Sequence, residues 1–233
     1  DQFSFISSDV TEIALSGEVL AGDSIAITSG DGEDDVLVYG TGRVESNQGS
    51  VSIDFGADNS ELILFEGSQI IANTGVTITG GAEDDLTLNG IIRAVDDLTV
   101  ALGDGENTID IGGSADIDST AGDIIFTFGD DNNDLTLDSD GSVTAQNNIS
   151  VSTGVGVDSV TIQGALTATS GNISLDMSTG FSSFEVTEGG LVSAGNQFDF
   201  NSNDTTEFTL RGELLAVDKI SIASGDGDDT FQL

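Results

Sequence analysis

One pattern of three short apolar segments, separated by polar turns, recurs about nine times along the 233 residues. Each repeat opens with a glycine followed by alternating apolar residues. The expected repeat starts lie mostly 22 to 26 residues apart, with one interval of 28, at Gly17, Gly42, Gly67, Gly90, Gly113, Gly141, Gly164, Gly190 and Gly212. A unit this short cannot bury its own apolar face, so the repetition favours units that stack on one another.

The spacing of the apolar residues within each unit predicts β-strands. The second segment has apolar residues two apart, as in Ile25 and Ile27, and the third does the same, as in Val36 and Val38. A period of two places one face of a strand inside and the other outside. Residues 1–16 supply the last two segments of an earlier unit. The sequence therefore predicts an all-β, right-handed parallel β-helix, or β-solenoid, with three strands per coil. Residues 1–233 form one domain of about nine coils, and the right-handed crossover is the default for parallel strands.

Stacking should align equivalent residues of successive coils at intervals of ~4.8 Å. We therefore expect Ile25, Val51, Val76, Leu98 and Ile149 to share one internal column. The chain contains no proline. Its absence agrees with this prediction because an interior strand must donate hydrogen bonds to a neighbour.

Composition limits the classes of function. The chain has 42 acidic residues against 4 basic ones, a formal net charge of −38, and no cysteine or histidine. A charge this large is typical of disorder, but 37% of the residues are hydrophobic and spread evenly, which favours a folded chain. Nucleic acid is an unsuitable partner because its phosphates would be repelled. We expect no disulfide, no zinc–thiolate site and no membrane insertion. The chain begins at Asp1, so we also expect a processed product or a fragment.

The turn between the second and third strands is acidic and rich in glycine. It reads Ser-Gly-Asp-Gly-Glu-Asp-Asp-Val at 29–36 and Ser-Gly-Asp-Gly-Asp-Asp-Thr-Phe at 224–231. This turn resembles the calcium-binding nonapeptide G-G-x-G-x-D-x-U-x of RTX (hemolysin-type) proteins, large bacterial extracellular proteins and adhesins in which Asp and backbone carbonyls bind Ca²⁺ between coils. The resemblance implies that Asp34, Asp84, Asp158 and Asp229 are ligands, with Asn107 and Asn133 in equivalent positions. The complete set of candidate ligands at this turn is Asp31, Asp34, Asp84, Asp85, Asp104, Asn107, Asp130, Asp134, Asp158, Asp226 and Asp229.

The chain departs from the RTX pattern in two ways. The RTX coil has two nonapeptides, whereas this coil is longer and has the motif at one corner only. Ser60, Ser182 and Thr206 occupy the ligand position in other coils, so a continuous row of calcium ions is not expected.

Electrostatics gives a separate reason to expect cations. Carboxylates stacked ~4.8 Å apart repel by ~1 kcal/mol in bulk water and by ~3 to 4 kcal/mol at an effective dielectric constant of 20. Calcium, which takes six to eight oxygen ligands, would turn this repulsion into cross-linking. The alternative is that the acidic turns are solvated loops that hold no metal.

Parallel β-helices also include polysaccharide lyases and hydrolases, which makes a polysaccharide-binding or polysaccharide-cleaving protein the main alternative. A lyase of this type needs a cationic base near a metal, and the chain offers only Arg43, Arg93, Arg211 and Lys219. We expect Arg43 and Arg93 on first strands two coils apart and the other two in turns. We therefore expect no enzymatic activity. With one Tyr and no Trp, the chain also has little material for stacking on sugars.

An ice-binding solenoid is a lesser alternative that requires a regular threonine array. Outward positions of the third strands carry Thr87, Thr136, Thr161 and Thr209, but other residues interrupt the row. We therefore predict an extracellular or cell-surface structural or adhesive rod: an adhesin spacer, a filament subunit or a surface-layer subunit. Its expected partners are Ca²⁺, copies of itself stacked end to end or further coils of the same chain, and cell-surface polysaccharide.

Overall fold

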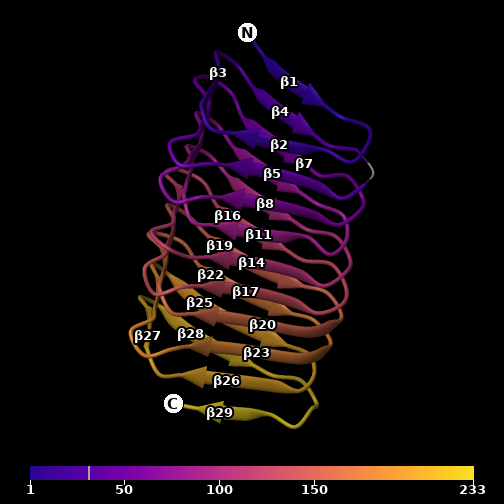
Figure 1. Cartoon of the computed structure of the whole chain (residues 1–233). Coiled ribbons are helices and arrows are strands. Elements are labelled where there is room, and N and C mark those ends of the chain that lie inside the picture. The colour runs from indigo at the N-terminus through magenta and orange to yellow at the C-terminus, as the bar shows by residue number, and fades with distance from the viewer. Residues whose placement is uncertain (31) are drawn as a thin grey trace.

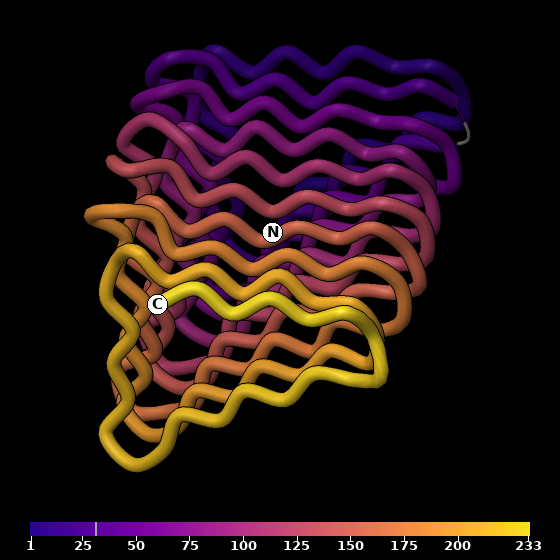
Figure 2. Tube along the Cα trace, turned by 90° about the horizontal axis from the view of Figure 1, so that it is seen from below, coloured from indigo at the N-terminus to yellow at the C-terminus, as the bar shows by residue number. Residues whose placement is uncertain are grey.

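The computed structural model describes residues 1–30 and 32–233, and its secondary structure over those residues is entirely β. The strands form three parallel sheets that run the length of the molecule from the N-terminal to the C-terminal end (Figure 1). Viewed along the stack, each coil has three sides (Figure 2). No described segment is a helix that could span a membrane.

Sheet A contains the second strand of each coil. In spatial order it consists of β1 (Phe3–Ile6), β4 (Ile25–Thr28), β7 (Val51–Asp54), β10 (Val76–Thr79), β13 (Leu98–Ala101), β16 (Ile124–Thr127), β19 (Ile149–Thr153), β22 (Ile173–Met177), β25 (Gln197–Ser202) and β28 (Lys219–Ala223).

Sheet B contains the third strand of each coil. In spatial order it consists of β2 (Glu12–Leu15), β5 (Asp34–Val38), β8 (Ser60–Leu64), β11 (Asp85–Leu88), β14 (Asn107–Ile111), β17 (Asn133–Leu137), β20 (Gly156–Ile162), β23 (Gly180–Val186), β26 (Thr206–Leu210) and β29 (Thr230–Gln232).

Sheet C contains the first strand of each coil. In spatial order it consists of β3 (Glu18–Ala21), β6 (Arg43–Ser46), β9 (Gln69–Ala72), β12 (Ile91–Ala94), β15 (Asp116–Ser119), β18 (Ser142–Ala145), β21 (Ala165–Ala168), β24 (Leu191–Ala194) and β27 (Glu213–Ala216). The predicted all-β solenoid with three strands per coil is therefore confirmed.

The ladder register confirms the predicted internal column. Ile25 pairs with Val51, Val51 with Val76 and Val76 with Leu98. Ile124 joins Leu98 to Ile149 in the same column. The partial first coil also has the predicted register, since Phe3 pairs with Ile25.

Two of the predicted coil starts are shifted in the structure. Gln69 pairs with Arg43, and Asp116 pairs with Ile91, so Ser68 and Ala115 occupy the positions that glycine holds in the other coils. Gly67 and Gly113 lie one and two residues earlier, in turns where their φ angles are +84° and +57°. These left-handed conformations favour glycine, which is why glycine marks the turn but not the start of the strand. The interval of 28 residues becomes 26, from Ala115 to Gly141.

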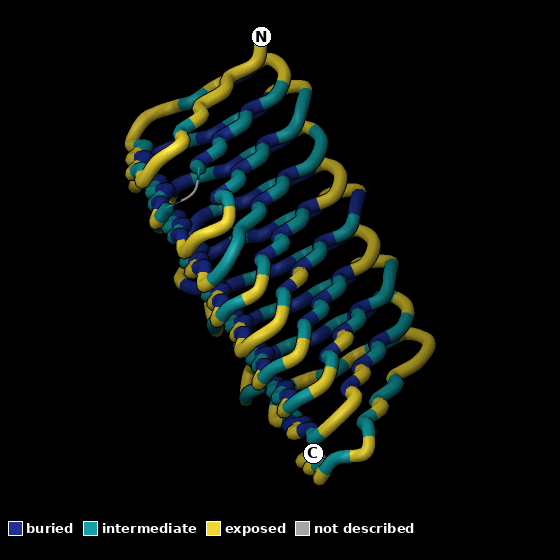
Figure 3. The backbone as a smooth tube through the Cα atoms, turned by 90° about the vertical axis from the view of Figure 1, so that its right-hand side faces the viewer, coloured by how far each residue is buried: buried dark blue, intermediate teal, exposed yellow. Residues whose placement is uncertain are grey.

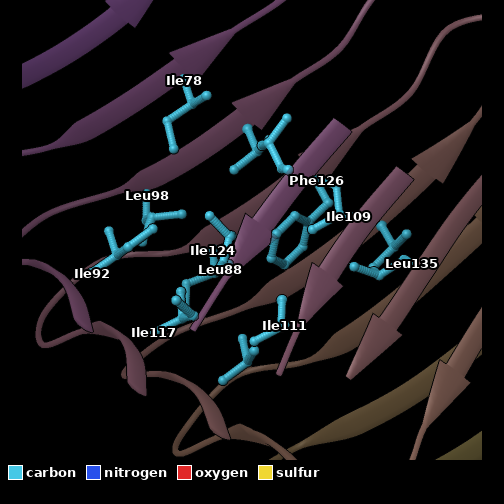
Figure 4. Close-up of a cluster of buried hydrophobic side chains, with 14 of the residues drawn as sticks. Ile78, Leu88, Ile92, Leu98, Ile109, Ile111, Ile117, Ile124, Phe126 and Leu135 are labelled. Carbon is cyan, nitrogen blue, oxygen red and sulfur yellow. The ribbon is translucent and has the colours of Figure 1, made fainter. Parts of the chain in front are cut away.

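Inward side chains of the three sheets form one continuous core, and burial alternates along the strands between the two ends of the rod (Figure 3). Ile78, Leu88, Ile92 and their neighbours from all three sheets meet in its middle (Figure 4). The second inward position of the sheet C strands is always Ala or Ser, from Ala21 to Ala216. Small residues let the chain turn closely there into the next strand. The fold thus places the polar turns at the corners of a filled, three-sided rod.

Candidate functional site

The acidic turn forms the corner between sheets A and B, and its first strand residues point into the rod. We call this row the inner polar column. Its members are Asp34, Ser60, Asp84, Asn107, Asn133, Asp158, Ser182, Thr206 and Asp229. Asp34 and Asp84 are fully buried and Asp158 is 2% exposed, whereas Asp229, in the last coil, is partly exposed. The Asp and Asn residues that the RTX resemblance assigns to one position therefore do lie in one column.

Carboxylates in this column accept hydrogen bonds from the backbone of the preceding coil. Asp34 Oδ1 lies 2.7 Å from the Thr11 N–H nitrogen, and Asp84 Oδ1 lies 3.0 Å from the corresponding nitrogen of Ser60. Asp229 accepts from the Thr206 N–H in the same way, at 3.0 Å. Each of these carboxylates thus satisfies a backbone donor at a corner where the chain leaves the regular ladder.

The second oxygens of two carboxylates stand apart. Within residues 1–30 and 32–233, no group forms a hydrogen bond with Asp34 Oδ2 or Asp84 Oδ2, and both oxygens are buried. Burial raises the pKa of Asp84 to about 7. Hydrogen bonds from the backbones of Ser60 and, to a smaller extent, Gly81 lower this pKa, and the charge of Asp85 raises it further. An ionised oxygen in such a place is costly unless a proton or a cation neutralises it.

A second set of carboxylates points outward, one residue farther along the same strands. We call Glu12, Asp35, Glu61 and Asp85 the outer acidic row, because the ladder stacks them in four successive coils. Burial, followed by the charges of Asp35 and Asp85, raises the pKa of Glu61. With Glu33 and Glu83, part of this row lines an open groove of about 360 Å³. Asp134 has the same outward position farther down the rod.

The remaining predicted ligands lie in the turns themselves. Asp104 Oδ1 accepts the Asp130 N–H at 3.0 Å, and Asp130 Oδ1 accepts the Val155 N–H at 2.9 Å. Asp226 is exposed in the last acidic turn. Asp31 lies outside the described residues.

The eleven predicted ligands are therefore distributed among an inner column, an outer row and the turns, and do not form one site. Over the residues 1–30 and 32–233, no three acidic side chains converge closely enough to hold a metal ion by themselves. A cation at this corner would need backbone carbonyls or water for most of its ligands.

The four basic side chains pair with acids across the surface. Arg93 contacts Asp116 and Asp118 of the next coil, with nitrogen–oxygen distances of 2.9 and 3.3 Å. Arg43 contacts Glu45, Arg211 contacts Glu185, and Lys219 contacts Asp199. Arg43 and Arg93 lie on sheet C two coils apart, as predicted. Lys219, however, begins strand β28 instead of lying in a turn.

A second Asp and Asn ladder was not anticipated from the sequence. It occupies the corner between sheets C and A, where Asp97, Asp123, Asn148 and Asn172 each accept a backbone N–H from the next coil at 2.8 to 3.1 Å. The available signal was an Asp or Asn immediately before the second strand of four successive coils. These hydrogen bonds link successive coils.

The outward threonines of sheet B are interrupted as expected. Thr87 is flanked by Ile63 and Asp110 in the ladder. The most exposed aromatic side chain of the corner between sheets B and C, Tyr39, stacks on Phe65 with ring centroids 4.6 Å apart, which covers one face of its ring.

Comparison of the chain with protein-family models, with curated proteins and with solved structures gave no match in any of the three searches. The resemblance to RTX repeats therefore depends on the acidic turns alone.

Proposed function

We propose that this chain is a non-catalytic structural or adhesive rod of an extracellular or cell-surface protein, stabilised by Ca²⁺ at the acidic corner. The observation that carries the rod is the set of three parallel ladders, which continue through all the complete coils. Each strand donates to or accepts from a neighbour along the whole length, and the core is filled with apolar side chains. Such a stack resists bending because every coil is bonded to the next.

Calcium is supported by the electrostatics of the corner. Among the described residues, Asp34 Oδ2 and Asp84 Oδ2 are buried acceptors without donors, and the outer acidic row adds four stacked carboxylates on the opposite face of the same sheet. Hard divalent ions suit either kind of oxygen, and turn carbonyls and water would complete the shell of an ion bound at one or the other. The proposal puts the rod outside the cell, where calcium is abundant and would stabilise the fold by binding it.

The test is thermal unfolding, followed by circular dichroism, in 2 mM Ca²⁺ or in EDTA at matched ionic strength. For a dissociation constant of ~10⁻⁴ M, binding at one site should stabilise the fold by about 2 kcal/mol and raise the melting temperature by a few degrees. Asp34→Ala and Asp84→Ala should weaken this response. Asp140→Ala, at an exposed turn on another corner, should leave it unchanged.

Magnesium at equal concentration serves as the ionic control. Identical melting curves in calcium and in EDTA would contradict the calcium part of the proposal and favour solvated acidic loops. The rod itself would be contradicted by small-angle scattering that showed a compact, near-spherical particle.

A further inference from the structure

The coils are of two kinds, which differ in how the polar atoms of the residue in the inner polar column find hydrogen-bond partners. In two adjacent coils this residue is asparagine. Asn107 Nδ2 donates to the carbonyls of Gly103 and Gly105 in its own turn, at 2.9 and 3.0 Å, and to Asn133 Oδ1 at 2.9 Å. One amide group therefore holds its own turn closed and bonds to the next coil.

Asn133 repeats this arrangement one coil farther on. Its Nδ2 donates to the carbonyls of Gly129 and Asp131, at 3.2 and 2.9 Å, and to Asp158 Oδ1 at 3.0 Å. Asp158 Oδ1 also accepts the Asn133 N–H at 3.1 Å. We call the sequence Asn107, Asn133 and Asp158 the amide ladder. The Nδ2 groups of both asparagines find acceptors within the protein.

Asp34 and Asp84 occupy the same column but have an oxygen where asparagine has its NH₂ group. A carboxylate cannot donate to turn carbonyls, and in the described part of the chain the buried Oδ2 atoms of both residues have no hydrogen-bond partner. A cation bound at the Oδ2 atoms of Asp34 and Asp84 would stabilise these coils as the Nδ2 donors stabilise the amide ladder. Both present positive charge to the surrounding oxygens.

The residue that faces this column also differs between the two kinds of coil. It lies two positions after the inward apolar pair of each sheet A strand, as Ser29 does after Ile25 and Ile27, and we call its position the corner slot. Beside Asn107 and Asn133 the slot holds Leu102 and Phe128, both buried. Beside Ser60 and Ser182 it holds Phe55 and Met177, also buried.

Beside the aspartates the corner slot is small or polar. It holds Ser29 before Asp34, Gly80 before Asp84 and Thr153 before Asp158. A Cβ atom built on Gly80 would stand 2.0 Å from Asp84 Oδ2, so this oxygen points into the slot. Large apolar side chains thus fill the slot only where the column residue carries no charge.

We infer that Ca²⁺ controls the rod locally: it orders the coils of Asp34 and Asp84, whereas the amide ladder keeps the coils of Asn107 and Asn133 ordered without metal. The inference rests on the proposed function and adds to it a boundary within the molecule. The rod would then have a calcium-dependent segment around β4–β11 and a permanently stiff segment around β14–β17.

Hydrogen exchange of the whole chain, resolved by peptide in 2 mM Ca²⁺ and in EDTA, tests this boundary. We expect calcium to slow exchange at least about tenfold in the turns and strands next to Asp34 and Asp84. The segment 103–137 should change by less than about twofold.

Two isosteric substitutions test the cause. Asp84→Asn should slow exchange around residue 84 in EDTA and remove the calcium response there, because the new amide supplies the donor. Asn107→Asp should make the segment around residue 107 calcium-dependent for the opposite reason. Retention of the β-sheet circular dichroism signal in each variant checks that the chain still folds.

The outcomes separate this inference from the proposed function. Equal protection of all coils by calcium would overturn the boundary but leave a calcium-stabilised rod. Absence of protection in every coil would overturn both. Faster exchange around residue 84 in folded Asp84→Asn, in EDTA, would show that the amide does not replace the cation and would also overturn the inference.

Discussion

Replacing Ile149 by aspartate should destabilise the middle of the rod far more than replacing its neighbour Ser150. Ile149 is fully buried in sheet A and stacks between Ile124 and Ile173 of the adjacent coils. Ser150 is the next residue in the same strand, is half-buried and faces outward. The two substitutions introduce the same charge one residue apart, on opposite faces of one sheet.

The expected magnitudes follow from these environments. Truncation of a buried isoleucine to alanine costs about 2 to 5 kcal/mol, through lost burial and the cavity that remains. A carboxylate in the same place also lacks any donor, because its neighbours in the column are hydrocarbon, so we expect Ile149→Asp to exceed about 4 kcal/mol. Ser150→Asp should stay within about 1 kcal/mol, and Ile149→Val should cost about 1 kcal/mol.

Urea-induced unfolding, followed by circular dichroism at constant ionic strength, measures all three variants. Because a solenoid coil contacts only its neighbours, Ile149→Asp could also separate the unfolding curve into two transitions, one for each side of the break. Comparable losses for Ile149→Asp and Ser150→Asp, or a larger loss for Ser150→Asp, would refute the register, since a slip of one residue exchanges the two faces of the strand.

Three further predictions concern the corners and the ends. In EDTA, Asp84 alone should cost the wild-type protein about 3 kcal/mol of stability between pH 5 and pH 8, because its folded pKa is about 7 against an ordinary value of 3.8 and its bound proton stabilises the fold only below that pH. Urea titrations should show a flatter pH dependence for Asp84→Asn, and equal slopes would contradict the assignment. Gly180→Ala should cost at least about 1 to 3 kcal/mol in the same assay, because Gly180 has a φ angle of +123° and an added Cβ would stand 1.9 Å from the Gly156 carbonyl oxygen. The control is Gly17→Ala, which should be near neutral because nothing lies within 4 Å of an added Cβ there. The 233-residue chain should self-associate through its exposed end, where Phe231 lies beside the unpaired edge of β29, and more strongly at high salt or high calcium, which screen the charge repulsion. Sedimentation velocity that shows a monomer at every salt concentration would count against end-to-end contact.

The sequence by itself determined the solenoid. Residues two apart along a strand must lie on one face, and repeated pairs such as Ile25/Ile27 and Val36/Val38 leave few other ways to bury that face. The sequence also predicted the acidic chemistry of the turn and which of its residues occupy equivalent positions in successive coils, because alignment of the strands fixes which turn residues stack.

Other features were decided by the tertiary structure. Gly67 and Gly113 resemble repeat starts in the sequence, but only the ladder shows that Ser68 and Ala115 hold those positions, since a turn can lengthen without altering the strand pattern. The direction of each acidic side chain was likewise hidden: Asp84 points inward and Asp85 outward, which makes one a buried acceptor and the other part of a surface row. Adjacent residues of the same type thus acquire different chemistry because burial, and not residue type, sets the energy of their charge.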